Sequence, residues 1–287
     1  MLRVGISCGD PNGIGPEVVL RALNAVGSGF TAVLFGFENL PSPQAGATAA
    51  SGRWSFNALE TATQAALKKE IDVLVTAPIS KTAWKLAGVQ SYTGHTDYMA
   101  AKCQARVRMG FLSEALNVVL QTIHTPLLKT IHDINPDGVF ESLQIIDAFW
   151  RRYWRKRPRI AVCGYNPHAG EAGLMGDEEQ RLIIPAILRA QAHDIQAYGP
   201  YPADTIFYQV AQKKSHDVVL AMYHDQGLGP VKTLAFDTAV NVTMGLPFIR
   251  TSPDHGTAYD IAGQNQADPA SMVEAIRWAV KLARPVG

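Results

Sequence analysis

The feature that most constrains this fold is an alternation of short apolar runs with longer helical segments. Eight runs of five to seven residues are rich in valine, isoleucine and leucine, and helical patterns separate most of them. Strands of a parallel sheet have this composition because helices bury both of their faces. The pattern predicts an α/β protein, with strands at 3–7, 31–37, 72–77, 117–123, 159–165, 194–199, 217–223 and 240–245.

The remaining chain divides into helices and one conspicuous loop. Segments 54–69, 139–154, 177–193 and 269–283 have apolar residues at the helical period, and the third begins with acidic residues, which favour a helix N-terminus. Residues 40–53 are small, polar and proline-rich, which predicts a surface loop. A chain of 287 residues exceeds the usual size of one compact domain, so we expect two lobes.

Charge and hydropathy argue against several classes of partner. Only 18% of the residues are charged and the formal net charge is +1, so no basic field would attract nucleic acid or an acidic membrane. The first residues lack the pattern of a secretory signal, and no apolar run approaches the roughly 18 residues that span a bilayer. We therefore expect a cytoplasmic protein with a small-molecule partner.

Three cysteines and three histidines have settings that predict no function. The cysteines are odd in number and far apart, which indicates neither a disulfide framework nor a CxxC metal site. We interpret them as reduced core residues: Cys8, Cys103 and Cys163. The histidines in predicted loops or helix ends, interpreted as surface or capping residues, are His132, His193 and His216.

Three other histidines share one context. His124, His168 and His224 each lie at, or just past, the carboxyl end of a predicted strand. Ligands of open α/β sheets bind at that edge, because the strand holds the backbone rigid while the following loop exposes the side chain. Three converging imidazoles could hold a divalent metal ion and leave positions for water or substrate. The alternative is three separate hydrogen-bonded histidines, since spacings of 44 and 56 residues carry no local signature.

Two cations flank a stretch that is otherwise almost without charge. Lys232 and Arg250 lie on either side of it, with Asn241 midway between them. An ammonium, an amide and a guanidinium could together bind a phosphate or a carboxylate. The equally weighted alternative is an internal ion pair with Asp237 or Asp254.

Two further blocks place polar groups where a helix begins. In TGHTDYM, His95 and Thr96 precede a helical segment, where an N-terminus and a hydroxyl favour an anion, although Thr96 could equally be an N-cap. In VTAPISK, Lys81 starts a helix after a buried strand. A lysine there opposes the helix dipole, so an anionic ligand and simple solvation are both reasonable explanations.

The block GDPNGIGPEVV imitates a dinucleotide-binding fingerprint. The third glycine of the fingerprint is missing, because Gly15 is followed by Pro16, Glu17 and Val18. Pro16 indicates instead that a helix begins there. The Rossmann interpretation therefore fails, although this loop offers Asp10 and Asn12 as polar groups for a site.

Taken together, these blocks resemble the 4-hydroxythreonine-4-phosphate dehydrogenase family. They occur in the family's order from residue 9 to about residue 263. The most specific of them runs from His224 to Gly263. The matching blocks are GDPNGIGPE, TAPISK, GHTDYM, TIHTPL, NPHAGEAGLMGDEE, GPYPADTIF, YHDQGLGPVK and VNVTMGLPFIRTSPDHGTAYDIAG.

The resemblance implies a fold similar to isocitrate and isopropylmalate dehydrogenases, with two α/β lobes and a cleft between them. The first lobe would comprise 1–94 and 230–287, and the second, 95–229, would carry most metal and dimer-interface elements. A homodimer whose active sites use both subunits is also implied. NAD or NADP would bind without a Rossmann fingerprint, in agreement with the missing glycine.

The resemblance also assigns residues. In the family three histidines bind a divalent metal (Zn, Mg or Co), and the matching positions are His124, His168 and His224, the last contributed across the dimer. The family's substrate contacts fall on His95, Thr96, Lys232, Asn241 and Arg250.

The implied reaction oxidises 4-phosphohydroxy-L-threonine to a β-keto acid, which loses CO2 to give 3-amino-2-oxopropyl phosphate, as in pyridoxal phosphate biosynthesis. Lys232 and Asp204 are the candidate catalytic residues, and Asp225 could orient His224. The alternative role of Asp204 is helix capping.

Departures from the family pattern leave other functions open. The chain is shorter than the family between the second and third predicted strands, and Asp97 replaces the more usual glutamate of the GHT block. The substrate could therefore be a threonate or erythronate phosphate, or an aromatic dihydrodiol carboxylate. The rivals are a noncatalytic phosphometabolite-binding protein and a phosphate acyltransferase.

Overall fold

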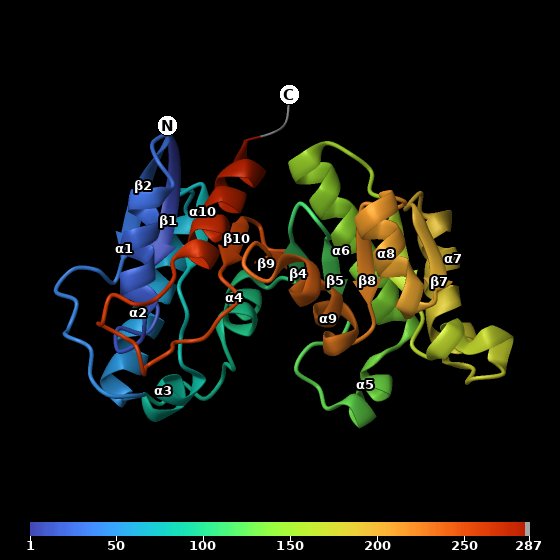
Figure 1. Cartoon of the computed structure of the whole chain (residues 1–287), viewed down its shortest axis with the longest axis horizontal. Coiled ribbons are helices and arrows are strands. Elements are labelled where there is room, and N and C mark those ends of the chain that lie inside the picture. The colour runs from blue at the N-terminus through green and yellow to red at the C-terminus, as the bar shows by residue number, and fades with distance from the viewer. Residues whose placement is uncertain (285–287) are drawn as a thin grey trace. The chain divides into compact units, whose positions relative to one another are not determined.

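The computed structural model describes residues 1–284 and divides them into two compact units. Among these residues, unit 1 comprises 1–107 and 237–284, and unit 2 comprises Arg108–Phe236. Figure 1 labels the elements of both units.

The sheet of unit 1 is mostly parallel. Strand β1 pairs in parallel with β2 and β3, and β3 with β10, whereas β9 runs antiparallel to β10. The carboxyl ends of these parallel strands therefore lie at one edge, where the amino end of β9 also lies. The order is β2 (Phe30–Phe35), β1 (Leu2–Ser7), β3 (Val73–Thr76), β10 (Ile249–Ser252) and β9 (Val240–Met244).

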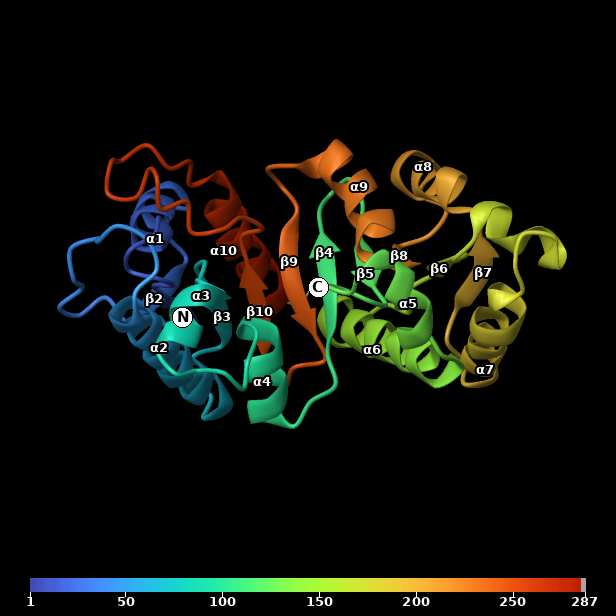
Figure 2. The ribbon, with the colours of Figure 1, turned by 90° about the horizontal axis from the view of Figure 1, so that it is seen from below.

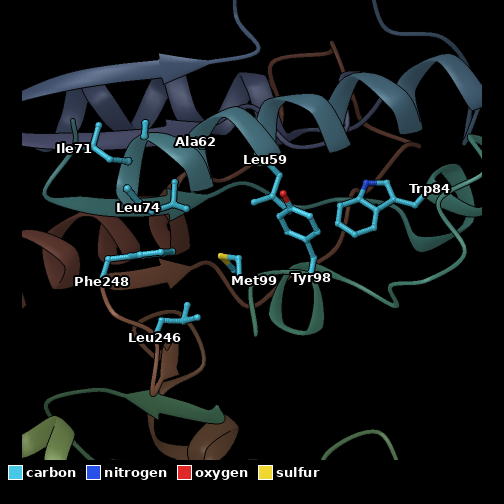
Figure 3. Close-up of a cluster of buried hydrophobic side chains, with 11 residues drawn as sticks. Leu59, Ala62, Ile71, Leu74, Trp84, Tyr98, Met99, Leu246 and Phe248 are labelled. Atoms are coloured by element: carbon cyan, nitrogen blue, oxygen red, sulfur yellow. The ribbon is translucent and has the colours of Figure 1, made fainter. Parts of the chain in front are cut away.

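Helices cover both faces of this sheet, as Figure 2 shows. Helices α1 (Gly15–Ala25) and α10 (Ala270–Ala283) pack together on one face. The opposite face carries α2 (Ala49–Leu67), α3 (Lys81–Leu86) and α4 (His95–Cys103). Between these helices and the sheet lies an apolar cluster (Figure 3), which includes Leu59, Leu74, Trp84, Tyr98, Met99 and Phe248.

The predicted loop over 40–53 ends earlier than expected. Helix α2 begins at Ala49, so residues 49–53 are helical. Thr48 and Ser51 form a capping box, in which the Thr48 hydroxyl accepts from the Ser51 amide at 3.0 Å and the Ser51 hydroxyl accepts from the Thr48 amide at 3.3 Å. Because this box satisfies otherwise unpaired amides and alanine favours helices, the small residues start a helix here.

Unit 2 has a sheet of the same kind. Strand β5 pairs in parallel with β8, β8 with β6, and β6 with β7, while β4 runs antiparallel to β5. The carboxyl ends of β5, β8, β6 and β7 consequently share one edge. The order is β4 (Arg108–Leu112), β5 (Val118–Leu120), β8 (Val218–Ala221), β6 (Ile160–Cys163) and β7 (Ala197–Tyr201).

Helices α6 (Pro136–Trp154) and α7 (Ile184–Ala192) lie on one face of this sheet, and α8 (Ala203–Lys213) and α9 (His224–Ala235) on the other (Figure 2). A short helix, α5 (Leu127–Asp133), follows β5. The helix expected over 177–193 has a π-helical turn at Glu179–Ile183 before α7. Pro185, which has no amide hydrogen, removes the usual i→i−4 bond at this junction.

The boundaries of the units differ from those expected. His95 and Thr96 were expected in the second lobe but lie in unit 1, because α4 contributes Tyr98 and Met99 to the apolar cluster there. Lys232 was expected in the first lobe but lies in unit 2, because α9 packs on β5 and β8.

All eight predicted strands form, and helices form in all four predicted segments. The α/β fold class is confirmed. Strands β4 and β10 were not predicted, because Arg108, Gly110 and Arg250 interrupt their apolar pattern. Within residues 1–284, no helix combines the length and apolar content that crossing a bilayer requires.

Candidate active site

The most unusual side chain of unit 1 is the buried Arg250, which is only 3% exposed. Three neutral oxygens accept its hydrogen bonds. Thr76 Oγ1 accepts from Nε at 3.1 Å and from Nη2 at 2.6 Å, while Nη1 donates to Thr243 Oγ1 at 3.0 Å and to Asn241 Oδ1 at 3.3 Å. These four residues are the arginine cluster. Adjacent strands β3, β10 and β9 supply them, and Asn241 and Thr243 share one face because they are two residues apart on β9.

The charge of Arg250 is not balanced by any carboxylate among residues 1–284. Its recorded contacts are the neutral oxygens of the arginine cluster, so Arg250 itself forms no ion pair with Asp237 or Asp254, and for Lys232 that alternative stays open. Burial lowers the pKa of Arg250 to about 9, which still leaves the guanidinium charged at neutral pH. A buried cation with only neutral neighbours favours an anionic ligand, because an anion would offset its desolvation cost.

His95 is the first residue of α4 and interacts with the Arg250 charge. Burial, together with that charge, holds the pKa of His95 well below its usual value, so its imidazole is neutral at pH 7. The Nε2 atom of His95 is buried and has no hydrogen-bond partner among the described residues. The neutral ring therefore leaves one polar atom available to a ligand.

Thr96 lies in the first turn of α4, whose N-cap is Gly94. The alternative of Thr96 as an N-cap is therefore wrong. Asp97 in the same turn accepts hydrogen bonds from the amide of Thr93 and, at 3.0 Å, from its hydroxyl. The shorter side chain that replaces the usual glutamate is thus used to hold the start of the helix.

Asp10 and Asn12 hold segments of unit 1 together. The fully buried Asp10 accepts from the Tyr259 hydroxyl at 2.8 Å and from the Ser51 hydroxyl at 3.3 Å. The Asn12 amide donates to the carbonyl of Gly46 at 2.9 Å, which fixes the loop before α2. Both side chains, considered in the sequence analysis as ligand-binding groups, are used in internal hydrogen bonds.

In unit 2, two of the three histidines line one pocket. Its volume is about 230 Å³, and the ring centroids of His124 and His224 are 5.8 Å apart. His124 follows β5, and His224 begins α9, separated from the end of β8 by Met222 and Tyr223. The pocket, called the histidine pocket below, is lined by Ile123, His124, Thr125, Leu127, Thr130, Tyr223, His224 and Asp225.

The spacing of these two rings concerns one chain, whereas the resemblance implies that His224 is contributed across the dimer. Two imidazole ligands of one divalent ion have centroids on the order of 5 Å apart, close to the spacing of His124 and His224. His224 Nδ1 lies 2.7 Å from Asp225 Oδ1. This contact orients the imidazole ring, so that Nε2 is the ring nitrogen that can bind a metal ion.

His168 does not line the histidine pocket. It is exposed on the turn after β6, in the left-handed region with φ 51°. Among the described residues of this chain, no three His, Cys, Asp or Glu side chains form a group that could hold a metal ion. The set of three histidine ligands therefore stays a prediction, which requires the second subunit that the resemblance implies.

The other candidates lie on helices. Lys232 is in the last turn of α9, with its Nζ 4.9 Å from the centroid of Phe236. Asp204 is exposed in the first turn of α8, whose N-cap is Pro202, so it is not the capping residue. Lys81 begins the six-residue α3 and is exposed, in agreement with simple solvation.

The residues without a predicted function take structural positions. The three cysteines are free: Cys8 and Cys163 are buried, and Cys103 is partly buried. His193 is the C-cap of α7, and His132 lies in the last turn of α5. His216 is half-buried before β8, where burial lowers its pKa. Thr76 and Thr243 were not predicted as site residues, although the two-residue spacing of Thr243 from Asn241 places both on one face of their strand.

The fold defines the class of protein. It is the α/β fold of the isocitrate dehydrogenases: the enzyme from Methylococcus capsulatus has a TM-score of 0.57 at 16% identity, covering 98% of this chain and 85% of that chain. At this identity the likeness concerns the fold alone.

The chain belongs to the family described as the pyridoxal phosphate biosynthetic protein PdxA, whose model matches residues 31–279. It is 42% identical to the 4-hydroxythreonine-4-phosphate dehydrogenase of Burkholderia vietnamiensis, over 99% of this chain and 97% of the relative. It is 38% identical to the D-threonate 4-phosphate dehydrogenase of Salmonella typhimurium, over 98% of each.

Among solved structures, the 4-hydroxythreonine-4-phosphate dehydrogenase of Klebsiella pneumoniae has a TM-score of 0.88 at 34% identity, covering 99% of this chain and 100% of that chain. The resemblance identified from the sequence and the expected fold are confirmed.

Proposed function

We propose a reaction and residue roles for this chain, which as a member of the PdxA family is an oxidoreductase. The substrate is 4-phosphohydroxy-L-threonine. Its secondary alcohol carbon loses a hydride to NAD or NADP, and its hydroxyl loses a proton to a base. The resulting β-keto acid loses its carboxylate as CO2, and protonation of the remaining enolate carbon gives 3-amino-2-oxopropyl phosphate.

The observation that carries this proposal is the buried guanidinium of Arg250, surrounded by neutral oxygens. A phosphate supplies the charge and the acceptors that such a group lacks. In the proposed complex Arg250 and Asn241 bind the phosphate, and Thr76 and Thr243 hold the guanidinium plane in place. Fixing the phosphate orients the carbinol hydrogen toward the nicotinamide, and such positioning contributes on the order of several kcal/mol to catalysis.

His95 and Thr96 are the proposed further contacts to the substrate. The imidazole of His95 stays neutral because of burial and the Arg250 charge, so it can donate or accept one hydrogen bond without competing for the anion as a second cation. Thr96 adds a hydroxyl and the amides of the first turn of α4, which favour negative charge.

His124, His168 and His224 are the proposed ligands of one divalent cation. When bound, such an ion lowers the pKa of a substrate hydroxyl and stabilises the enolate that decarboxylation leaves. The support from this chain is that Asp225 Oδ1 lies 2.7 Å from His224 Nδ1 and so orients the ring that the resemblance contributes across the dimer. Lys232 and Asp204 are the proposed proton-transfer residues.

Reduction of NAD or NADP by 4-phosphohydroxy-L-threonine tests the reaction directly. Activity should disappear after chelation and return with Zn²⁺, Mg²⁺ or Co²⁺. Turnover that is insensitive to chelation would remove the metal from the proposal, and tight ligand binding without nucleotide reduction would identify a binding protein.

A second substrate is favoured by one comparison. The D-threonate 4-phosphate dehydrogenase of Salmonella typhimurium is 38% identical over nearly the whole chain, close to the 42% of the other relative. Both substrates carry the phosphate that the arginine cluster would bind, so that cluster does not distinguish them. Comparing kcat/KM for the two phosphorylated acids decides which is preferred.

A further inference from the structure

The imidazole of His95 has an aromatic neighbour that the proposed function does not use. The indole of Trp84 meets this ring edge-on, with the two centroids 6.0 Å apart and the planes inclined by 68°. Edge-to-face pairs are favoured at centroid distances of roughly 4.5–7 Å, because the positive edge of one ring meets the negative face of the other. His95 is the first residue of α4, where no preceding helical turn restricts its side chain. The indole therefore limits the orientations of the imidazole.

Trp84 is itself fixed from several sides. It is completely buried on α3, at one end of the apolar cluster of unit 1 (Figure 3). Its Nε1 donates to the hydroxyl of Ser55 on α2 at 3.0 Å. The ring of Phe56, the next residue on α2, meets the indole edge-on with centroids 5.3 Å apart. The indole consequently has one defined position, against which the imidazole packs.

A glycine allows α2 and α3 to come close enough for these contacts. A Cβ atom added at Gly52, one turn before Ser55, would overlap the main-chain carbonyl of Ala83 and would lie 2.9 Å from the amide nitrogen of Trp84. A larger residue at this position would displace α3, and Trp84 with it. The packing of α2 against α3 thus sets the position of the indole, and the indole transmits it to His95 on α4.

We propose that Trp84 is a positioning residue for His95: it holds the imidazole in the orientation in which this ring contacts the phosphorylated substrate. The inference rests on the proposed function, since it assumes that His95 contacts the substrate. Without the indole, the imidazole would sample several orientations, and the substrate would have to order it on binding. Affinity would then fall although every group that touches the substrate is still present.

The test is the Kd of 4-phosphohydroxy-L-threonine, measured by titration calorimetry without nucleotide. The free energy of an edge-to-face pair corresponds to a change of about 2- to 10-fold in an equilibrium constant, so Trp84→Leu should raise the Kd by this factor. Trp84→Phe, which keeps an aromatic ring beside His95, should retain most of the affinity.

Trp54→Leu is the matched control. Trp54 lies on α2 in the same unit, and its Nε1 also donates one hydrogen bond, to the carbonyl of Gly36 at 2.8 Å. Gly36 immediately follows β2, so this bond holds the sheet and not α3 or α4. The variant should lower the melting temperature and leave the Kd unchanged.

A double-mutant cycle distinguishes positioning from a general structural effect. If Trp84 acts through His95, Trp84→Leu should have little effect on the Kd in a His95→Gln background. A general structural effect would raise the Kd by the same factor in both backgrounds. Equal factors in the two backgrounds, or an unchanged Kd in Trp84→Leu alone, would overturn the inference.

Ser55→Ala is the milder variant, which keeps the test decisive even where Trp84→Leu does not fold. It leaves the indole in place and removes only the acceptor of its Nε1. The Kd should rise by a smaller factor than in Trp84→Leu, and again only while His95 is present. No increase in Kd for Ser55→Ala would count against the positioning role.

His95→Gln alone separates the two proposals. If it binds the phosphorylated substrate as tightly as the wild type does, the proposed contact of His95 is wrong. If it binds more weakly while Trp84→Leu binds like the wild type, only the role of Trp84 is wrong.

Discussion

At the scale of single residues, two side chains of unit 1 depend on each other electrostatically. Arg250 is buried with neutral oxygens around it, and its charge helps to keep His95 neutral. The pair therefore presents one fixed cation and one uncharged imidazole. Such a pair can bind a ligand whose phosphate contacts Arg250 and whose neutral polar group contacts His95.

Replacing Arg250 by methionine should damage phosphate recognition selectively. Hydrogen bonds to charged groups contribute about 1.5–3 kcal/mol, so we expect kcat/KM for the phosphorylated substrate to fall roughly 10- to 100-fold. A dephosphorylated analogue should lose much less. Steady-state kinetics with both substrates measure this, and Arg277→Met, at an exposed ion pair on α10, is the control. Equal losses for the two substrates would indicate a structural role.

His95 should make the protein less stable in acid. Its pKa is lowered in the folded state, whereas the imidazole in the unfolded chain has its ordinary pKa of 6.5. The unfolded state therefore gains more protons as the pH falls below about 6.5, and folded stability decreases. In His95→Gln this decrease should be smaller. Urea unfolding at pH 7.5 and 5.5 tests it, with the exposed His132→Gln as the control. The same acid loss in wild type and His95→Gln would contradict it.

At the scale of elements, helix α2 illustrates how a short local signal sets a boundary. The capping box of Thr48 and Ser51 satisfies amides at the helix start, and it places the beginning of α2 several residues before the apolar period does. The spacing of apolar residues identifies the middle of a helix, whereas capping side chains determine where its first turn begins.

Thr48→Ala should lower the free energy of unfolding by about 1 kcal/mol, since it removes the N-cap acceptor. The control is Thr61→Ala in the same helix, where the exposed hydroxyl donates to the carbonyl of Asn57 at 2.9 Å. That change should be neutral or slightly stabilising, because alanine favours helix interiors. Chemical denaturation measures both, and equal effects at the two positions would rule out a capping role.

At the scale of the whole molecule, each unit places the carboxyl ends of its parallel strands at one edge. In unit 2 these ends carry the histidine pocket, and in unit 1 the strands carry the arginine cluster. Because strands form rigid and buried parts of each unit, a ligand that binds side chains anchored on them should stabilise the folded chain.

The phosphorylated substrate alone should raise the stability of the wild type. At a free concentration of about 100 times Kd, linkage gives an increase of about 2.7 kcal/mol in the free energy of unfolding. At the same concentration Arg250→Met should show little increase. Denaturation with and without ligand, in the absence of nucleotide, measures this. An equal gain in both proteins would mean that the phosphate binds elsewhere.

Much of the fold follows from local pattern. The eight predicted strands and the four predicted helical segments follow from the period of apolar residues, which is set by backbone geometry over a few residues. The same pattern did not predict β4 and β10, because Arg108, Gly110 and Arg250 interrupt the run of apolar residues in them. Arg250 is buried because residues of other strands surround it, and the residues next to it in the chain do not indicate this.

The sequence by itself determined the α/β class and placed His124, His168 and His224 after strands, because each feature depends on residues that are adjacent in the chain. Only the tertiary structure decided that Thr76 binds Arg250, which is 174 residues away, and that Gln226 reaches Gly164, 62 residues away. Such bonds depend on which strands become neighbours. Strand order is decided by packing over the whole unit, and a local pattern does not encode it.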